Sequence, residues 1–400
     1  MILAVFFLLS FLFFSKRKSV VIVYLIILTL NFVHYNISLS YEKKGLSIFT
    51  KDLLDDEIVY AKIPSNLAQN YDINVFDYNK YISHASILQV RESGYLSLNG
   101  VRVSYVSFII FKIFGSNFFT LKILISFVFT LLFIEIKKLF LHLGVTNYLS
   151  LKYSLLTILI PNLIIRALQI EKDIFLIYLS IWTINYILEN RKIFRLQFLV
   201  KIILLFVLRT YLAVILILSK NIFYKKFFVS KSILLQFIIS LIIFIFSISS
   251  LRILNPEIFQ YLVSVKSYSV LNGYTGIIDV SYETTSDIIN TFMISLYYFF
   301  LSPISVYAIE GSFLWKILIL EPLLFFLIPI FLIFYNRKFL DKKSLYCISI
   351  AILVSLTTLS FESHFTSTMR KRLIPYILIT AVGLSNHHKR QFSKIYEYKK

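Results

Sequence analysis

The sequence predicts an all-α protein: a polytopic bundle of about nine to twelve transmembrane helices with re-entrant or amphipathic segments and two sizeable outer loops. The first observation is composition, since 58% of the 400 residues are hydrophobic and the mean hydropathy is +0.79. A soluble domain is only about 45–50% apolar, so a soluble core cannot absorb this excess. The second is pattern, because apolar runs of about 15–22 residues alternate with short charged clusters.

The apolar runs are the candidate membrane helices of one integral membrane domain, residues 1–400. Run 101–114 has only fourteen residues and carries Arg102, Tyr105 and Lys112. Run 197–219 carries Arg209 near its middle, and run 291–309 contains Pro303, which removes a helical hydrogen-bond donor. We expect these three runs to be amphipathic or re-entrant. The full set of runs is 2–14, 19–39, 101–114, 118–134, 148–165, 174–188, 197–219, 232–254, 291–309, 313–335, 344–361 and 373–384.

Basic residues predict which loops face the cytoplasm. Lys and Arg outnumber Asp and Glu by 41 to 21, which gives a net charge of +20. In a membrane protein this excess indicates cytoplasmic loops rather than nucleic-acid binding, because insertion and anionic lipids both favour Lys and Arg there. Two long polar segments, 40–100 and 255–290, then lie outside the cytoplasm, as do 166–173 and 361–372. The cytoplasmic clusters are SKRK at 15–18, EIKK at 135–138, ENRKIFR at 189–195, KNIFYKKFFVSK at 220–231, NRKFLDKK at 336–343 and the tail at 387–400.

Acidic residues are concentrated in the first outer segment. Residues 40–100 hold eight of the 21 acids, and Asp55, Asp56 and Glu57 are adjacent. One interpretation is a helix that starts near Asp52, where the helix dipole favours negative charge. The other is a catalytic site, because adjacent carboxylates repel, and one of them can then hold a raised pKa and accept a proton from a hydroxyl nucleophile. Asp55 or Asp56 as the ligand of a divalent cation is a further alternative.

Basic residues on the outer side or at membrane depth are the second unusual feature. A charge inside a membrane segment costs about 2.5–3.5 kcal/mol, so snorkelling or an ion pair such as Arg166 with Asp173 is one interpretation. A guanidinium group also matches the geometry of phosphate, which predicts a site for a lipid with a phosphate or pyrophosphate headgroup. Tyr60 is a candidate for stacking on a sugar. The candidate substrate-binding residues are Tyr60, Arg166, Lys172, Asp173, Arg209, Arg370 and Arg372.

Four stretches resemble the polytopic membrane glycosyltransferases of the GT-C fold, which use polyprenyl-linked sugars outside the cytoplasm. LDDEIVYAKIPSNLA at 54–68 resembles the first outer loop of the family, with its acidic residue. SGYLSLNGVRVSYVSFIIFKIFGSNFFTLKIL at 93–124 resembles the segment that follows, in which Gly-Tyr leads to an apolar helix. IPNLIIRALQIEKDIFLIYLSIWTI at 160–184 and STMRKRLIPYILITAVG at 367–383 resemble two later elements with Pro and basic residues. The chain departs from the family because its acidic loop follows a second helix, not the first.

The resemblance implies that Asp55 or Asp56 acts as base or metal ligand, and that Lys172, Arg370 and Arg372 contact the lipid phosphate. The implied reaction transfers a sugar or glycan from a polyprenyl-(pyro)phosphate carrier to a glycan or lipid acceptor. It would serve cell-envelope polysaccharide assembly at the outer face of a bacterial inner membrane, with other assembly proteins as partners. The chain also resembles the Wzy-type polymerases of O-antigen and capsule. A lipid-linked oligosaccharide flippase or other transporter is the remaining alternative, since intramembrane Arg suits it as well.

Overall fold

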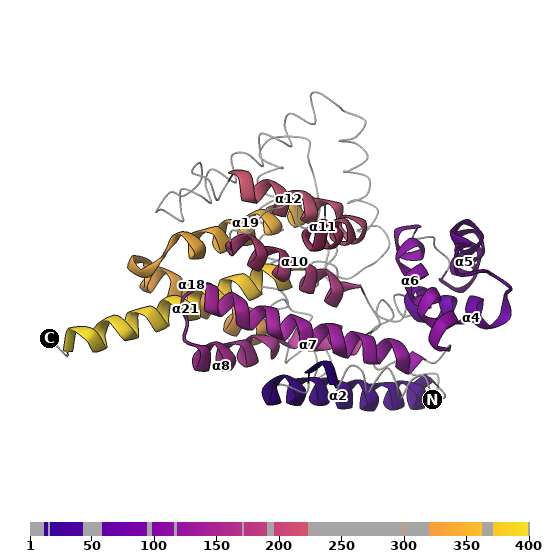
Figure 1. Cartoon of the computed structure of the whole chain (residues 1–400), viewed down its shortest axis with the longest axis horizontal. Coiled ribbons are helices and arrows are strands. Elements are labelled where there is room, and N and C mark those ends of the chain that lie inside the picture. Colours follow the sequence, from indigo (N-terminus) through magenta and orange to yellow (C-terminus); the bar gives the residue numbers. More distant parts are fainter. Residues whose placement is uncertain are drawn as a thin grey trace, which may run out of the picture. The chain divides into compact units, whose positions relative to one another are not determined.

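Every element that the computed structural model describes is a helix (Figure 1). The described residues are 12–14, 17–42, 58–93, 98–115, 118–169, 172–189, 196–222, 300, 320–361 and 371–398. Within these ranges there is no strand, so the predicted all-α class is confirmed for them. Asp55, Asp56, Glu57 and Arg370, like the outer segment 255–290, lie outside the described residues.

The helices belong to two compact units. Unit 1 comprises residues 1–134 and 163–178, and unit 2 comprises residues 135–162 and 179–400. In chain order the elements are α2 (Lys18–Glu42), the π-helical turn η1 (Ile58–Lys62), α4 (Ile63–Asn70), α5 (Tyr78–Ser93), α6 (Leu98–Phe114), α7 (Phe118–His142), α8 (Asn147–Ile158), α9 (Pro161–Leu168), α10 (Asp173–Leu188), α11 (Leu196–Leu208), α12 (Thr210–Ile222), η2 (Leu323–Leu327), α18 (Ile328–Tyr335), the 3₁₀ turn η3 (Arg337–Phe339), α19 (Lys342–Phe361) and α21 (Leu373–Tyr398).

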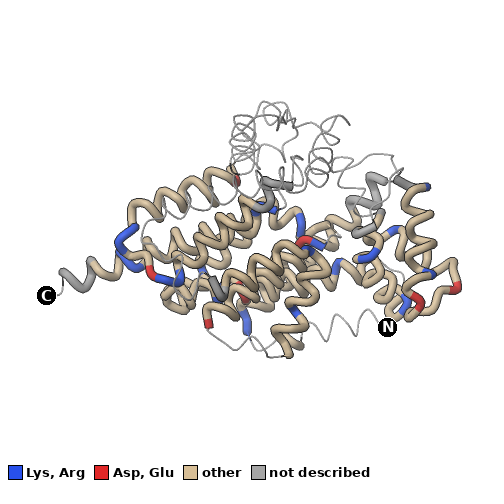
Figure 2. Tube along the Cα trace, turned by 90° about the horizontal axis from the view of Figure 1, so that it is seen from above, with Lys and Arg blue, Asp and Glu red and all other residues tan. Residues whose placement is uncertain are grey.

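Two of the described helices are long and apolar enough to cross a membrane, judged by length and composition. They are Lys18–Asn36 of α2 and the whole of α7. Helices α8 and α9 form a third span if they cross together, although they bend by 70° at the break between them. Pro161 accounts for this break, because it has no N–H to continue the helix that precedes it. Charged residues are sparse along the tube of Figure 2, as membrane association requires.

Helix α7 extends beyond the predicted run 118–134. The sequence analysis places EIKK at 135–138 in a loop, whereas these residues continue the helix to His142. Glu, Lys and Leu all favour helix, so a hydropathy boundary is not a helix boundary here. The helix ends where Gly144 adopts a left-handed φ of 86°. Val145 N–H then donates to Phe140 O at 3.0 Å, which is the pattern of a Schellman C-cap.

The predicted interruption at Arg209 is present. Helix α11 ends at Leu208 and α12 begins at Thr210, so run 197–219 is two helices that pack against each other. Each has 13 residues and is about 20 Å long. A bilayer core is about 30 Å thick, so neither helix spans it alone. The expectation that this run does not make a simple crossing agrees with the structure.

Residues 58–93, which belong to the segment predicted to form the first outer loop, fold into helices. Helices α4, α5 and α6 pack against one another, and η1 packs on all three. The tyrosine hydroxyl of Tyr81 lies 2.7 Å from Ser104 Oγ inside this group. Its apolar core consists of Ile63, Leu67, Ile73, Tyr81, Ala85, Leu88, Val101 and Phe108. Residues 58–93 and 98–114 therefore form a packed group of helices in unit 1 rather than a solvated loop.

In unit 2, the long helix α21 packs against α8, α18 and α19. Gly383 lets α21 approach α18 closely, because a Cβ on Gly383 would lie 2.7 Å from Pro329 O. The end of α21 is also tied to the start of α19, since Lys389 Nζ lies 2.9 Å from Asp341 Oδ2. Asp341 Oδ1 accepts the N–H of Ser344 at 2.8 Å and thus caps α19. Burial alone would raise the pKa of Asp341, but these hydrogen bonds outweigh it and the pKa is lowered.

We expect Gly383→Ala to destabilise unit 2, because the added methyl group would meet the Pro329 backbone and push α21 away from α18. Overpacking of this kind costs about 1–3 kcal/mol. Thermal unfolding of the purified protein measures the loss. Ser385→Ala is the matched control: it places alanine two residues further along the same helix, where the buried serine hydroxyl has no hydrogen-bond partner among the described residues. Equal melting temperatures for both variants would contradict the close packing.

Candidate functional site

Buried polar residues converge in unit 1 where α2, α7 and α9 meet. Asn31 and His34 lie three residues apart on α2, and Lys122 and Ser126 lie four apart on α7, so each pair shares one helix face. All four are buried. The last turn of α9 adds Arg166 and the residue after it adds Gln169, and both are also buried. We refer to Asn31, His34, Lys122, Ser126, Arg166 and Gln169 as the unit 1 polar cluster.

Side chains from α2 and α7 hold the end of α9. The Asn31 amide donates to Ser126 Oγ and to Ala167 O, both at 3.0 Å. The Lys122 ammonium donates to Leu168 O. The final carbonyls of a helix have no partner within the helix and carry its negative dipole end, which makes an amide and an ammonium suitable partners for them.

Two cations of this cluster are almost completely buried. Lys122 is 2% exposed and Arg166 is 4% exposed. Lys122 Nζ lies 3.5 Å from His34 Nδ1, and because an ammonium group only donates, the imidazole nitrogen is the acceptor. Arg166 Nη1 donates to Gln169 Oε1 at 2.9 Å. Two basic side chains are therefore buried among the apolar helices of unit 1.

The unit 1 polar cluster also has unused hydrogen-bonding capacity. Gln169 Nε2 and Asn31 Oδ1 are buried and have no hydrogen-bond partner within the described part of the chain. Thr120 Oγ1, two residues before Lys122 on α7, is in the same condition. A buried polar atom without a partner costs about 1–3 kcal/mol, so such atoms call for a ligand or water. The donors of Lys122, Arg166 and Gln169 suit an anion with several oxygen atoms.

The structure places the other sequence-predicted residues as follows. Asp173 is buried as the first residue of α10, where the helix dipole favours its negative charge, and Lys172 precedes it, half-buried. Tyr60 is buried in η1. Arg209, in unit 2, donates to Tyr211 Oη at 3.2 Å. Arg372 also belongs to unit 2, and its environment is described below.

The predicted acid site remains a prediction. Asp55, Asp56 and Glu57 lie outside the described residues, as does Arg370. Within the described residues, no group of three or more His, Cys, Asp or Glu side chains is arranged to hold a metal ion.

Sequence reasoning missed His34 and Lys122. Lys122 lies inside run 118–134 and His34 inside run 19–39, so each is a polar group in a predicted span. The argument that singled out Arg209, that a charge inside a membrane segment needs a reason, applies equally to Lys122. Asn31 carries no comparable signal, because an uncharged amide in an apolar run is less costly than a charge, and Gln169 lies in the polar segment 166–173, outside any predicted span.

Unit 2 contains a buried ion pair that the sequence analysis did not foresee. The guanidinium group of Arg372 donates to Glu321 Oε1 from Nη2 at 2.9 Å and from Nε at 3.2 Å, and both side chains are fully buried. Glu321 Oε2 accepts the backbone N–H of Asn162 at 2.7 Å, at the start of α9. The guanidinium group also lies 5.0 Å from the centre of the Tyr376 ring. Arg372 thus has a carboxylate and an aromatic face as partners within its own unit.

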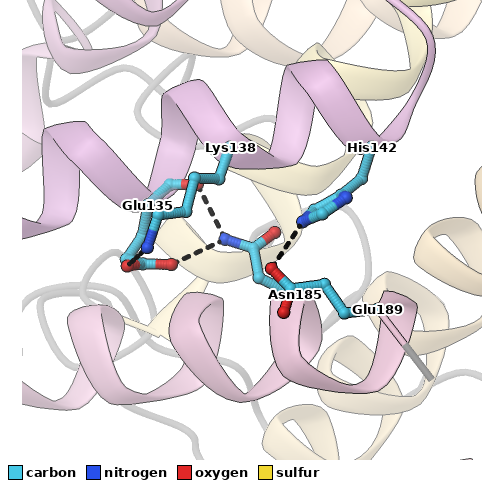
Figure 3. Close-up of polar contacts among 5 residues, drawn as sticks. All are labelled: Glu135, Lys138, His142, Asn185 and Glu189. Atoms are coloured by element: carbon cyan, nitrogen blue, oxygen red, sulfur yellow. Dashed lines mark hydrogen bonds and ion pairs between the residues drawn. The ribbon is translucent and has the colours of Figure 1, made fainter. Parts of the chain in front are cut away.

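A second polar group of unit 2 joins α7 to α10 (Figure 3). The Asn185 amide donates to the Glu135 carbonyl at 2.8 Å and to Glu135 Oε2 at 2.9 Å. Lys138 Nζ lies 2.6 Å from Glu135 Oε1, and His142 Nε2 lies 3.3 Å from Glu189 Oε1. The end of α7 and the end of α10 up to Glu189 are therefore neighbours. These contacts explain packing and suggest no ligand.

We expect Glu321→Gln to destabilise the protein by about 3–5 kcal/mol, because the buried guanidinium loses the carboxylate that compensates its charge. The double variant Glu321→Leu, Arg372→Met removes both charges at similar volume and should recover most of the loss. Thermal unfolding of the two variants and the parent measures this. A double variant less stable than Glu321→Gln would show that the pair is not the source of the effect.

Comparisons with known proteins give no match to this chain. No family model, no curated protein sequence and no solved structure matches it. The buried polar contacts described above are therefore what any functional proposal has to explain. Among them, the unit 1 polar cluster combines buried cations with unused hydrogen-bonding atoms.

Proposed function

We propose that the chain is a membrane glycosyltransferase that transfers a sugar or glycan from a polyprenyl-(pyro)phosphate carrier to a glycan or lipid acceptor. The observation that carries the proposal is the unit 1 polar cluster. A phosphate group would accept hydrogen bonds from the Lys122 ammonium, the Arg166 guanidinium and the Gln169 amide. Its polyprenyl chain would lie along the apolar helices.

The chemistry of sugar transfer requires a base and a site for the departing phosphate. Cations that neutralise charge developing on the leaving group lower the barrier, and a carboxylate activates the acceptor hydroxyl. We assign the first role to Lys122 and Arg166, with Lys172 as a further candidate phosphate contact, and the second role to Asp55 or Asp56. Arg372, which the resemblance also implies as a phosphate contact, is instead fully buried against Glu321 in unit 2. A divalent cation at Asp55 or Asp56 would assist if the reaction needs one.

The proposed enzyme is a polytopic bundle of about nine to twelve transmembrane helices with its site on the extracytoplasmic face of a bacterial inner membrane. The contact between Asp341 and Lys389 supports this topology, because it joins two segments that the charge rule places on the cytoplasmic side. The contacts of Glu135 and Glu189 support it in the same way. The unit 1 polar cluster lies at the opposite end of α7, around Lys122.

Two alternative functions are a polymerase, which would use the unit 1 polar cluster, and a transporter. A Wzy-type polymerase would bind a lipid pyrophosphate at the same cluster and join longer glycan units, so it shares the site. A transporter of lipid-linked oligosaccharides is favoured by a different observation, the fully buried pair of Glu321 with Arg372. Intramembrane ion pairs of this kind occur along substrate paths in transporters.

The test measures binding of undecaprenyl phosphate, and of undecaprenol as the uncharged probe, to the protein in nanodiscs. Undecaprenyl phosphate should bind more tightly than undecaprenol. Lys122→Gln should weaken binding of the phosphate at least about tenfold, because a hydrogen bond from a charged donor contributes about 1.5–3 kcal/mol. Asp55→Asn and Asp56→Asn, tested separately, should leave this binding intact, and at least one of them should abolish release of lipid phosphate from an undecaprenyl-phosphate-linked sugar.

Lys137→Gln is the matched control, since Lys137 lies on the same helix α7 but outside the cluster. It should change neither binding nor transfer. Equal affinity for the phosphate and the alcohol would refute phosphate recognition by this chain. Undiminished transfer in both Asp variants would refute only the assignment of the base. Movement of intact lipid-linked glycan across the bilayer, without release of lipid phosphate, would identify a transporter.

A further inference from the structure

The turn between α4 and α5 presents an aromatic side chain to its surroundings. Phe76 is 92% exposed, more than any other large apolar side chain in the described part of the chain. Helix α5 beside it is largely polar, and the turn itself contains Asp72, Asn74 and Asp77. A scattered exposed apolar residue is ordinary, but one at the apex of a fixed turn needs an explanation.

Helix α6 fixes the turn from one side. The Tyr105 hydroxyl donates to Val75 O, and Lys112 Nζ donates to Tyr71 O at 3.3 Å. Tyr105 and Lys112 are seven residues apart, so they project from the same face of α6. The two ends of the turn are thus attached to one helix face about two turns apart.

Helix α5 and the turn itself supply the remaining contacts. Lys80 Nζ donates to Asp72 O at 2.7 Å. Asn74 Oδ1 accepts the N–H of Phe76 at 3.0 Å, and Asp77 Oδ1 accepts the N–H of Lys80 at 3.0 Å, which caps α5. With these bonds in place, the backbone around Phe76 is preorganised and its ring is held outward.

The surface beside the turn is apolar. Val106 and Ile113 follow Tyr105 and Lys112 by one residue each, and they are 57% and 54% exposed. They form a stripe on α6 next to the face that holds the turn. Helix α6 is itself an apolar helix, so the exposed ring of Phe76 lies beside a surface suited to hydrocarbon.

We propose that this turn is an interfacial anchor that inserts the Phe76 ring into the bilayer. The groups around it are those of a membrane interface: Tyr71 and Tyr78 are aromatic residues with polar tips, and Lys80 and Lys112 are long basic side chains. The two ammonium groups offset Asp72 and Asp77, so the apex carries no net negative charge that lipid phosphates would repel. The anchor would hold the group of helices α4, α5 and α6 against the membrane surface.

The anchor is independent of the proposed sugar transfer, and its test requires no substrate. A Phe76→Trp variant is placed in nanodiscs made with either ordinary or brominated phosphatidylcholine. The emission spectrum of the parent protein, which contains the two native Trp residues, is subtracted from that of the variant. The added fluorescence should be blue-shifted, lost in brominated lipid and resistant to iodide. Because Phe76 is exposed, the substitution leaves the apolar core of these helices unchanged.

Ser83→Trp is the matched control, since Ser83 is exposed on the polar helix α5. Its added fluorescence should be quenched by iodide and unaffected by brominated lipid. If the Phe76→Trp variant behaves like this control, the turn faces water and the anchor is refuted. Iodide quenching that a soluble glycan prevents would also refute it, and would indicate instead that the ring stacks on sugars.

Discussion

Polar side chains bind the unpaired backbone groups at both ends of the short helix α9. At its start, Pro161 occupies the first position, where a missing N–H costs nothing, and the N–H of Asn162 donates to Glu321. At its end, the carbonyls of residues 167 and 168 accept hydrogen bonds from Asn31 and Lys122. An anion at the N-terminus and a cation at the C-terminus both complement the helix dipole. Each of these contacts lies within its own unit.

These contacts are better understood as determinants of specificity than as sources of stability. Desolvation of a buried ion pair roughly cancels its attraction, so Arg372 with Glu321 adds little net stability compared with apolar residues of the same size. Separating the two partners leaves a buried charge uncompensated, which is costly. Only helix packings that keep Arg372 and Glu321 together are therefore populated. Apolar helices in a membrane attract one another weakly, so a polar contact can decide which faces meet. The unit 1 polar cluster differs because its buried amide atoms still have unused bonding capacity.

Sequence reasoning succeeded where a single physical property decides the outcome. Composition predicts helices, and the charge of Arg209 predicts the break between α11 and α12. It failed at the boundary of α7, because the hydropathy of EIKK resembles a loop while its helix propensity does not. The partners of Arg372 also could not be predicted, since Glu321 lies 51 positions away and nothing local links the two. The helices of residues 58–93 were hidden by their polar composition, which is that of a loop.

The central claim is that the end of α7 around Lys122 lies at the extracytoplasmic face and receives a lipid phosphate there. The most direct measurement of that location is labelling of single cysteines in intact cells with a membrane-impermeant maleimide, and the buried Cys347 makes the parent protein a suitable blank. The account predicts that cysteine in place of Ser83 is labelled in intact cells, while cysteine in place of Lys338 is labelled only after permeabilisation. Labelling of both positions from the same side, or the reverse order, would contradict it.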